Sequence, residues 1–331
     1  MDLSGRVVMV TVMKPSTHRS GGVALGYLRT TALMCAALAV LSSCQVATSS
    51  SHRTFATPED AAKALIGAVE QGKVDELVQI FGPDGKELID TSDPATARQN
   101  RQVFLAAVAE GWRFAEHGAG RKVLVIGNEA WPFPVPLAED PNGWRFDAAA
   151  GREEIVARRI GRNELAAIQI CRAYVTAQRL YAKQPHDGKP PGLYAKTFRS
   201  DPGKQNGLFW PATRGQKRSP LGDLLADAAA VRGPQAAADR KPNPFYGYYF
   251  AVLTAQGAAA SGGAKAYIVN GEMSGGFALL VWPAHYDVTG VMTFMVNQTG
   301  VIYEKDLGTG TDAAASAISV YNPDASWVPV Q

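Results

Sequence analysis

The 331-residue sequence has few of the side chains that most often carry enzyme chemistry. It contains three cysteines and five histidines, and the histidines beyond residue 43 are widely separated. They lack the spacing of metal ligands. The G-x-S-x-G, H-E-x-x-H, P-loop and paired C-x-x-C motifs are also missing. We therefore expect no metal and no cofactor, and no motif identifies a substrate.

The chain also lacks a strong charge imbalance. Its formal net charge is +3, from 33 basic and 30 acidic residues. Residues 1–43 hold four of those basic residues and one of the acidic ones, so the remainder is balanced. A cluster of arginines between Arg152 and Arg162 is interleaved with glutamates, which is typical of an ion-paired helix face. This balance argues against a nucleic-acid partner.

One apolar run stands out near the start of the chain. It covers Leu33–Leu41, follows Arg29 and ends in Ser42-Ser43-Cys44. A bilayer span needs about 20 residues, whereas a signal-peptide core is this short. The order of charge, apolar run and small residues predicts a lipoprotein signal peptide over residues 1–43. A buried core helix of the same length is the alternative.

This signal would place a lipid on Cys44 and leave residues 44–53 as a flexible tether. Translation starting at Met1, Met9 or Met13 is compatible with it. We expect the protein to be anchored to a membrane of the cell envelope. By resemblance to lipoprotein sorting signals, Gln45 after the cysteine implies the periplasmic face of the outer membrane.

The third cysteine, Cys171, would then be the one thiol left after removal of Cys35 and acylation of Cys44. A single thiol forms no intramolecular disulfide, so the fold depends on burial instead. Cys171 lies on the apolar side of a predicted helix, which predicts a buried structural cysteine.

Residues 54–150 predict an α+β unit. Thr57 and Pro58 mark a helix start, and Gly82-Pro83 would end a second helix over 74–81. A third helix is predicted over 94–116. Strands are predicted over 122–126, 131–137 and 144–147, with Asn142-Gly143 as a hairpin turn. The order of these elements resembles the cystatin-like cone.

Residues 151–331 predict a long amphipathic helix packed on an antiparallel sheet. The helix covers 151–183 and carries a polar stripe on one side. The Pro- and Gly-rich stretch from Pro185 to Pro220 is too punctuated for long elements. A short helix is predicted over 221–231. Strands are predicted over 246–254, 266–269, 277–282, 291–297 and 301–304, with a turn at 297–300.

Several stretches resemble an uncharacterised family of bacterial exported proteins, domain of unknown function family 2950. The matching stretches are Trp131–Pro134, Gly151–Ile155, Gly161–Glu164, Phe245–Phe250 and Tyr303–Gly308. The resemblance covers nearly the whole chain after the leader and implies no known activity.

The second half also resembles the soluble part of type IV pilins and pseudopilins. Asn163-Glu164 and Thr176–Gln178 are similar to the exposed half of a pilin helix. Gly247–Phe250 and Thr293–Ile302 are similar to a pilin sheet. Here a separate unit precedes the helix, where a pilin has an apolar membrane segment, so the resemblance does not imply filament assembly.

Two groups of residues are candidates for binding or catalysis. Trp131, Phe133 and Trp144 would lie on one sheet face, as a ligand surface or as core. Glu304 and Asp306 would share one face of a strand, and the loop histidine His285 is a further candidate. A charged sheet edge is the alternative for the two carboxylates.

The sequence therefore predicts a lipid-anchored envelope protein that acts as a non-enzymatic binding or assembly module, with an envelope protein as its partner. The alternative is an envelope hydrolase that uses Glu304, Asp306 or His285.

Overall fold

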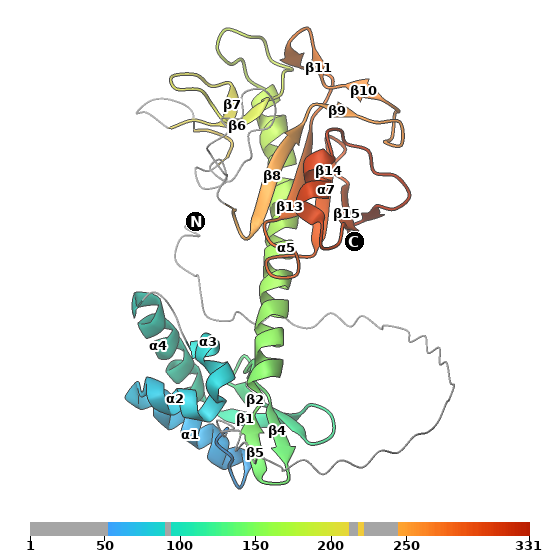
Figure 1. The fold of residues 1–331 in the computed structure, drawn as a ribbon. Coiled ribbons are helices and arrows are strands. Elements are labelled where there is room, and N and C mark those ends of the chain that lie inside the picture. Colours follow the sequence, from blue (N-terminus) through green and yellow to red (C-terminus); the bar gives the residue numbers. More distant parts are fainter. Residues whose placement is uncertain (1–51, 90–93, 212–217, 222–243) are drawn as a thin grey trace, which may run out of the picture. The chain divides into compact units, whose positions relative to one another are not determined.

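The computed structural model describes residues 52–89, 94–211, 218–221 and 244–331 (Figure 1). The predicted signal peptide, Cys44 and residues 222–231 of a predicted helix lie outside these ranges. The protein has an α+β fold, as predicted. The chain divides into two compact units, unit 1 up to Ile155 and unit 2 from Val156. The predicted boundary at 150/151 and this division both fall inside one long helix.

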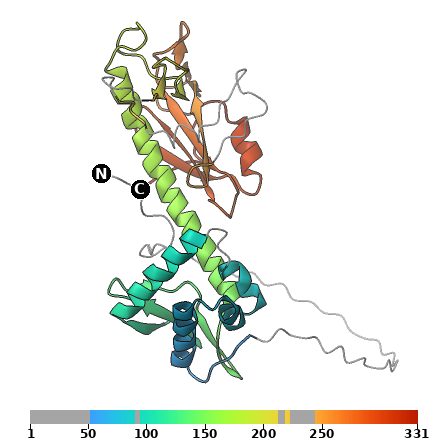
Figure 2. The same cartoon turned by 90° about the vertical axis from the view of Figure 1, so that its left-hand side faces the viewer.

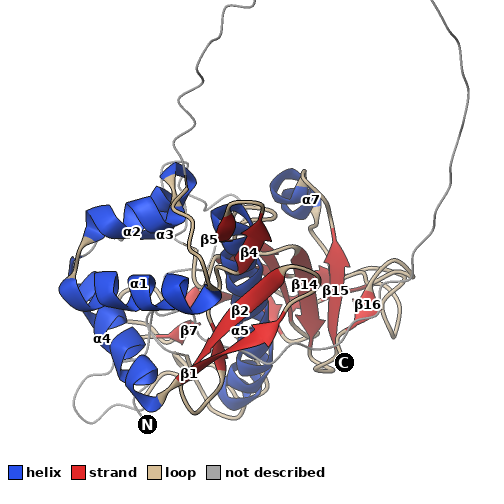
Figure 3. Ribbon diagram, turned by 90° about the horizontal axis from the view of Figure 1, so that it is seen from below, coloured by secondary structure: helices blue, strands red, loops and turns tan. Residues whose placement is uncertain are grey.

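Unit 1 consists of helices followed by an antiparallel sheet. The helices are α1 (Pro58–Gln71), α2 (Val74–Phe81), η1 (Pro83–Gly85, 3-10), α3 (Lys86–Ile89) and α4 (Pro94–Glu110). The strands are β1 (Trp112–Glu116), β2 (Arg121–Ile126), β3 (Trp131–Pro132), β4 (Leu137–Asp140) and β5 (Gly143–Phe146). Their order is β1-β2-β4-β5, and β3 also pairs with β2. Figure 3 shows the helices on one side of this sheet.

The predicted helix boundaries at α1 and α2 are confirmed. The amide N–H of Asp60 donates to Thr57 Oγ1 at 3.1 Å, and Pro58 occupies the first turn, where no N–H is needed. Gly72, with φ of 66°, ends α1 in the left-handed conformation. Helix α2 ends at Phe81, directly before Gly82-Pro83.

Two other predictions for unit 1 are wrong in part. The helix predicted over 94–116 ends at Glu110, because Gly111 turns the chain with φ of 128° and the next residues form β1. The strand predicted over 131–137 is confined to β3, while β4 begins at Leu137. The prolines between these strands have no N–H to donate to a ladder. The hairpin between β4 and β5 is confirmed, but its turn residues are Pro141 and Asn142, because Gly143 already pairs with Asp140 as the first residue of β5.

A single helix, α5 (Ala148–Ala182), begins in unit 1 and continues into unit 2. It starts three residues before the predicted Gly151, because Asp147 caps it. The Asp147 backbone carbonyl accepts from the Gly151 N–H at 2.9 Å, and the Asp147 carboxylate accepts from the Ala150 N–H at 3.2 Å.

Unit 2 packs α5 against a five-stranded antiparallel sheet. The strands are β8 (Tyr248–Leu253), β13 (Ala278–Pro283), β14 (Met292–Asn297), β15 (Ile302–Asp306) and β16 (Val328–Pro329), in the order β16-β15-β14-β13-β8. The smaller pairs are β6 (Thr197–Arg199) with β7 (Gly207–Phe209), β9 (Ala255–Gln256) with β10 (Lys265–Ala266), and β11 (Ile268–Val269) with β12 (Glu272–Met273). A further helix is α7 (Thr311–Ala317).

The sheet of unit 2 is covered on both faces. Helix α5 and helix α7 lie on opposite sides of it (Figures 1 and 2). All six residues of β13 are buried, which explains why its sequence is a continuous apolar run. The Trp282 indole N–H donates to the Asp312 carboxylate of α7 at 3.1 Å. The four long strands and the turn at 297–300 confirm the predicted sheet, and α7 and β16 were not predicted.

The two faces of α5 follow the predicted amphipathic pattern. Tyr174 and Cys171 are fully buried, and the Tyr174 ring packs edge-on against Phe277 at 5.6 Å. Burial raises the pKa of the Cys171 thiol to about 12, so this thiol stays protonated. The polar stripe begins at Arg162, which is half-buried. Its members between Gln169 and Lys183 are solvent-exposed.

Gln178 is the one polar residue of α5 that is completely buried. Its Nε2 donates to Ala195 O at 2.8 Å and to the Tyr174 hydroxyl at 3.0 Å. Its Oε1 accepts from the Ala195 N–H at 2.9 Å. The Gln178 amide group therefore pairs with the backbone of Ala195 as a neighbouring strand would, and it holds this part of the chain against α5.

Replacing Gln178 with Leu should lower the free energy of unfolding by roughly 3 kcal/mol. The substitution keeps the volume of the side chain but leaves the buried N–H and C=O of Ala195 without partners. Each unsatisfied buried group costs about 1–3 kcal/mol. Denaturant unfolding measures the loss. Gln169→Leu, on the exposed side of the same helix, is the matched control and should change stability by less than about 0.5 kcal/mol. Equal effects of both substitutions would contradict the role assigned to Gln178.

Candidate functional site

Polar residues gather in unit 2 where α5 passes the loop between β13 and β14. The Glu164 carboxylate of α5 accepts two backbone N–H groups at the start of β14, from Val291 at 2.9 Å and Met292 at 3.0 Å. Asn163 Nδ2 donates to Thr289 O at 2.8 Å. Two adjacent helix residues thus bind a loop that is more than 120 residues away in the sequence.

Two glycines allow this close approach. A Cβ on Gly247 would lie 2.7 Å from both Asn163 Nδ2 and Thr289 Cβ, and a Cβ on Gly290 would overlap the Tyr248 hydroxyl. Gly247 also has φ of 70° and follows Tyr246 with φ of 48°. The strand predicted from Tyr246 therefore begins at Tyr248, and the Tyr246 side chain is half-exposed instead of lying in the core.

Glu304 of β15 lies beside this cluster. Burial, followed by the charge of Glu164, raises the pKa of the Glu304 carboxyl above its ordinary value. Burial and both carboxylates raise the pKa of Tyr248, whose hydroxyl donates to Met292 O at 3.1 Å.

Asp306 and His285 are the other predicted site residues, and Asp306 contacts Tyr286, the residue that follows His285. The Tyr286 hydroxyl donates to Asp306 Oδ2 at 3.1 Å, and the Gly308 N–H donates to Asp306 Oδ1 at 2.7 Å. His285 is exposed, and its backbone closes a turn with Thr289 at 3.0 Å. These contacts give Asp306 and the His285 backbone structural roles in the β13–β14 loop.

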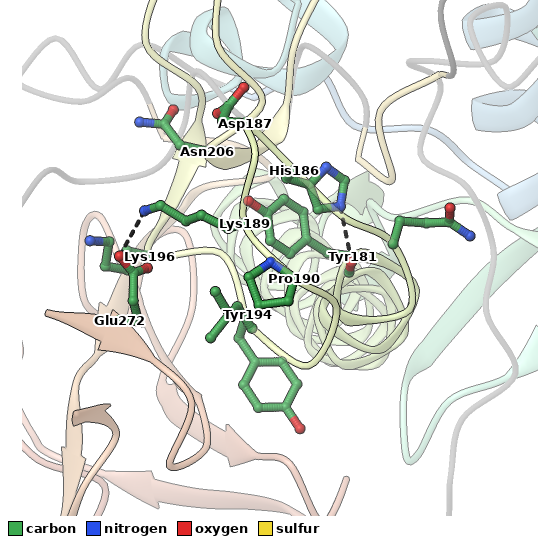
Figure 4. Close-up of a pocket in the computed structure, with 11 residues that line it drawn as sticks. Tyr181, His186, Asp187, Lys189, Pro190, Tyr194, Lys196, Asn206 and Glu272 are labelled. Carbon is green, nitrogen blue, oxygen red and sulfur yellow. Dashed lines mark hydrogen bonds and ion pairs between the residues drawn. The ribbon is translucent and has the colours of Figure 1, made fainter. Parts of the chain in front are cut away.

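A second polar site is a small pocket at the carboxyl end of α5 (Figure 4). Its volume is about 30 Å³, enough for about two water molecules. It is lined by Tyr181, Gln184, His186, Asp187, Lys189, Pro190, Leu193, Tyr194, Lys196, Asn206 and Glu272. Most of these residues come from the loop that follows α5, and Glu272 comes from β12.

His186 forms the inner wall of this pocket. Its ring stacks on Tyr181 with centroids 3.8 Å apart and an interplanar angle of 10°. Nε2 lies 3.0 Å from the Tyr181 carbonyl oxygen, which can only accept, so Nε2 carries the proton. Nδ1 is buried, and it has no hydrogen-bond partner within the described ranges.

The rim of the pocket carries balanced charges. Lys189 Nζ contacts Glu272 Oε1 at 2.7 Å, and Lys196 Nζ donates to Gly271 O at 2.9 Å. The hydrogen bond from Lys189 and the charges of both lysines lower the pKa of Glu272. Asp187 accepts the Gln205 N–H with both carboxylate oxygens, at 2.9 and 3.1 Å. Figure 4 shows Asp187 and Glu272 at separate positions on the rim.

Tyr181 connects the rim to the helix. Its hydroxyl donates to Gln205 O at 2.8 Å. Burial, together with the charges of Asp187 and Glu272, raises the pKa of Tyr181 to about 12, so the hydroxyl keeps its proton at neutral pH. Tyr194, on the opposite wall, packs edge-on against Phe277 at 4.8 Å.

The predicted aromatic residues of unit 1 are half-buried and pack against its core. Phe133 contacts four rings, with centroid distances of 6.0 to 6.4 Å, from Phe81, Phe104, Trp131 and Phe146. Trp131 is half-buried, and its indole N–H has no acceptor among the described residues. Trp144 is half-buried under Lys122, whose ammonium lies 5.8 Å from the ring centroid.

Within the described ranges, no three His, Cys, Asp or Glu side chains are arranged to hold a metal ion. None of the helices described there is both long and apolar enough to cross a membrane.

The fold and these sites define an α+β protein of two units, with its polar sites in the second unit. The chain belongs to the family described as protein of unknown function DUF2950, whose sequence profile matches residues 52–330. Comparison with curated proteins and with solved structures finds no significant match.

The pocket residues were not predicted as a site. Most of them belong to the Pro- and Gly-rich stretch after residue 184, in which no periodicity places a side chain. Glu164 was noted only within a matching stretch. Its proximity to Glu304 depends on how α5 crosses the sheet, which hydrophobic periodicity does not specify.

Replacing Glu304 with Gln should change how stability depends on pH. A carboxyl with a raised pKa in the folded protein binds more protons folded than unfolded, so the free energy of unfolding falls as the pH rises above the ordinary value of 4.5 and through the raised pKa. Glu304→Gln cannot ionise and should remove this fall, which raises the melting temperature at pH 7.

Melting curves between pH 4 and pH 8 measure this effect. Glu153→Gln, an exposed substitution of the same type on α5, is the control and should follow the wild-type profile. A Glu304→Gln profile parallel to that of the wild type would contradict the assignment.

Proposed function

We propose that this protein is exported and anchored to the cell envelope by a lipid on Cys44, and that it acts there as a non-enzymatic binding or assembly module. The anchor is supported by the order of Arg29, the apolar run Leu33–Leu41 and the small residues before Cys44. Gln45 supports the periplasmic face of the outer membrane.

One observation carries the binding role over the hydrolase alternative. The carboxylates at the β13–β14 loop bind groups of the fold itself: Glu164 accepts two backbone N–H groups, and Asp306 accepts a backbone N–H and the Tyr286 hydroxyl. A general acid or base must instead reach a proton of the substrate. The polar groups here support a rigid surface for a partner.

The second unit also supports an assembly role through its architecture. A long helix packed along an antiparallel sheet is the arrangement expected of a pilin-like soluble domain. Here Asn163 and Glu164 join the helix to the β13–β14 loop, and Gln178 joins it to the chain at Ala195. We infer that such a domain, carried here by a lipid in place of an apolar helix, presents a face to an envelope protein.

Replacing Cys44 with Ala should abolish incorporation of labelled fatty acid and leave unprocessed or released protein. The lipid is attached through the cysteine sulfur, so no other side chain nearby replaces it. Metabolic labelling followed by fractionation of the envelope measures the result. Cys35→Ala, in the same apolar run, is the matched control and should be labelled normally. Labelling of Cys44→Ala, or loss of labelling in Cys35→Ala, would contradict the anchor.

The binding role is tested on the anchored protein in its native envelope. Chemical cross-linking and affinity purification should recover a stable envelope protein partner, and Glu304→Gln and His285→Ala should recover it equally. Recovery of no partner, together with hydrolase turnover that these two substitutions remove, would establish the enzyme instead.

A further inference from the structure

We propose that β1, at the edge of the unit 1 sheet, pairs in antiparallel orientation with β1 of a second copy of this chain. The pairing joins the unit 1 sheets of the two copies into one continuous sheet across a twofold axis. Its basis is a row of backbone groups on β1 that point away from β2. The inference goes beyond the proposed function, because it stands on unit 1 and needs no lipid on Cys44.

The hydrogen bonds at the two ends of the β1–β2 ladder show which residues of β1 face outward. The Gly127 N–H donates to Gly111 O at 2.8 Å, and the His117 N–H donates to Arg121 O at 3.0 Å. Successive residues of a strand point their backbone groups to opposite sides, so the residues between Gly111 and His117 alternate. The N–H and C=O groups that point away from β2 are those of Trp112, Phe114 and Glu116.

This outer side of β1 is unpaired within the described ranges, where no hydrogen bond joins its backbone groups to another segment. The described element along which β1 lies is β2, and Figure 3 shows β1 beside β2 at the edge of the sheet. Arg113 and Ala115 are exposed. Trp112 and Phe114 contact each other edge-on at 5.8 Å and pack against the core, which holds the strand in place.

The other three edges of the two five-stranded sheets are closed. At β5, Phe55 and Trp144 exchange backbone hydrogen bonds of 2.8 and 2.7 Å. At β16, Pro329 has no N–H to donate. At β8, the central Phe250 is completely buried. The sequence of β1 contains no proline or glycine, and an edge strand left open in this way is a template for another strand.

The charges of β1 are compatible with a second copy in one register. In this register Phe114 lies opposite Phe114 of the second copy. Trp112 then lies opposite Glu116, and Arg113 lies opposite Ala115, so each charged side chain faces an uncharged one. A shift of two residues in one direction sets the two Arg113 side chains opposite each other, which is destabilising. The same shift in the other direction leaves Trp112 beyond the end of the partner strand.

The test is sedimentation equilibrium of the purified full-length protein in density-matched detergent, with micelles in excess over protein. The expected result is a reversible equilibrium between monomer and dimer. Ala115→Lys sets a lysine opposite Arg113 at two symmetric positions and should weaken the dimer roughly tenfold. Ala115→Glu sets opposite charges at the same positions and should leave the dimer at least as stable as that of the wild type.

A double variant tests the register. Arg113→Glu combined with Ala115→Lys again sets opposite charges against each other and should restore the dimer that Ala115→Lys weakens. Both positions are exposed, so the fold of each variant should be retained, which circular dichroism checks. Ala313→Lys, the same substitution at an exposed position of α7, is the control and should dimerise as the wild type does.

A protein that stays monomeric at every concentration, or a dimer that Ala115→Lys does not weaken, would overturn the proposal. A monomer that loses a cross-linked envelope protein on Ala115→Lys would also overturn it, because the edge would then receive a strand of that protein. Failure here is separate from failure of the proposed function, because labelling of Cys44 and recovery of an envelope partner do not require a dimer.

Discussion

The packing of α5 against the sheet is the constraint on which the rest of unit 2 depends. The helix buries Tyr174 and Cys171 on the sheet side and uses side chains at different levels to hold loops in place. Glu164 and Asn163 bind the β13–β14 loop, and Gln178 binds the chain at Ala195. A displacement of the helix would leave several buried backbone groups without partners at once, so its position on the sheet is strongly specified.

The same packing places a second carboxylate, Glu164, beside the predicted site residue Glu304. The charge of Glu164 contributes to the raised pKa of Glu304, and a shifted pKa is often a mark of acid–base chemistry. Here the Glu164 carboxylate binds two backbone N–H groups at the start of β14. The raised pKa of Glu304 is therefore the consequence of its burial, followed by the charge of a carboxylate with a structural role. Structural networks shift pKa values by the same physics as active sites do.

Local signals in the sequence predicted much of the fold and little of the candidate site. Thr57, Pro58 and the Gly82-Pro83 pair have direct effects on the backbone, and they marked helix ends correctly. The apolar runs of β13 and β14 identified their strands. Gly111 was read as part of a helix, because its turn depends on a positive φ that the sequence pattern does not reveal. The pocket was not predicted, because long-range contacts of an irregular segment bring its residues together.

The same contacts hold the irregular segment after α5 in one position, where it forms a wall of the pocket. The Gly192 N–H donates to Ala182 O at 2.8 Å, the Tyr194 N–H donates to Met273 O at 2.8 Å, and Ala195 is held by Gln178 from both its N–H and its C=O. The segment is thereby tied to the end of α5 and to β12, the two elements that complete the pocket. A site whose walls are fixed before a ligand arrives loses less conformational entropy on binding. The packing that stabilises unit 2 therefore also fixes the walls of the pocket at the end of α5.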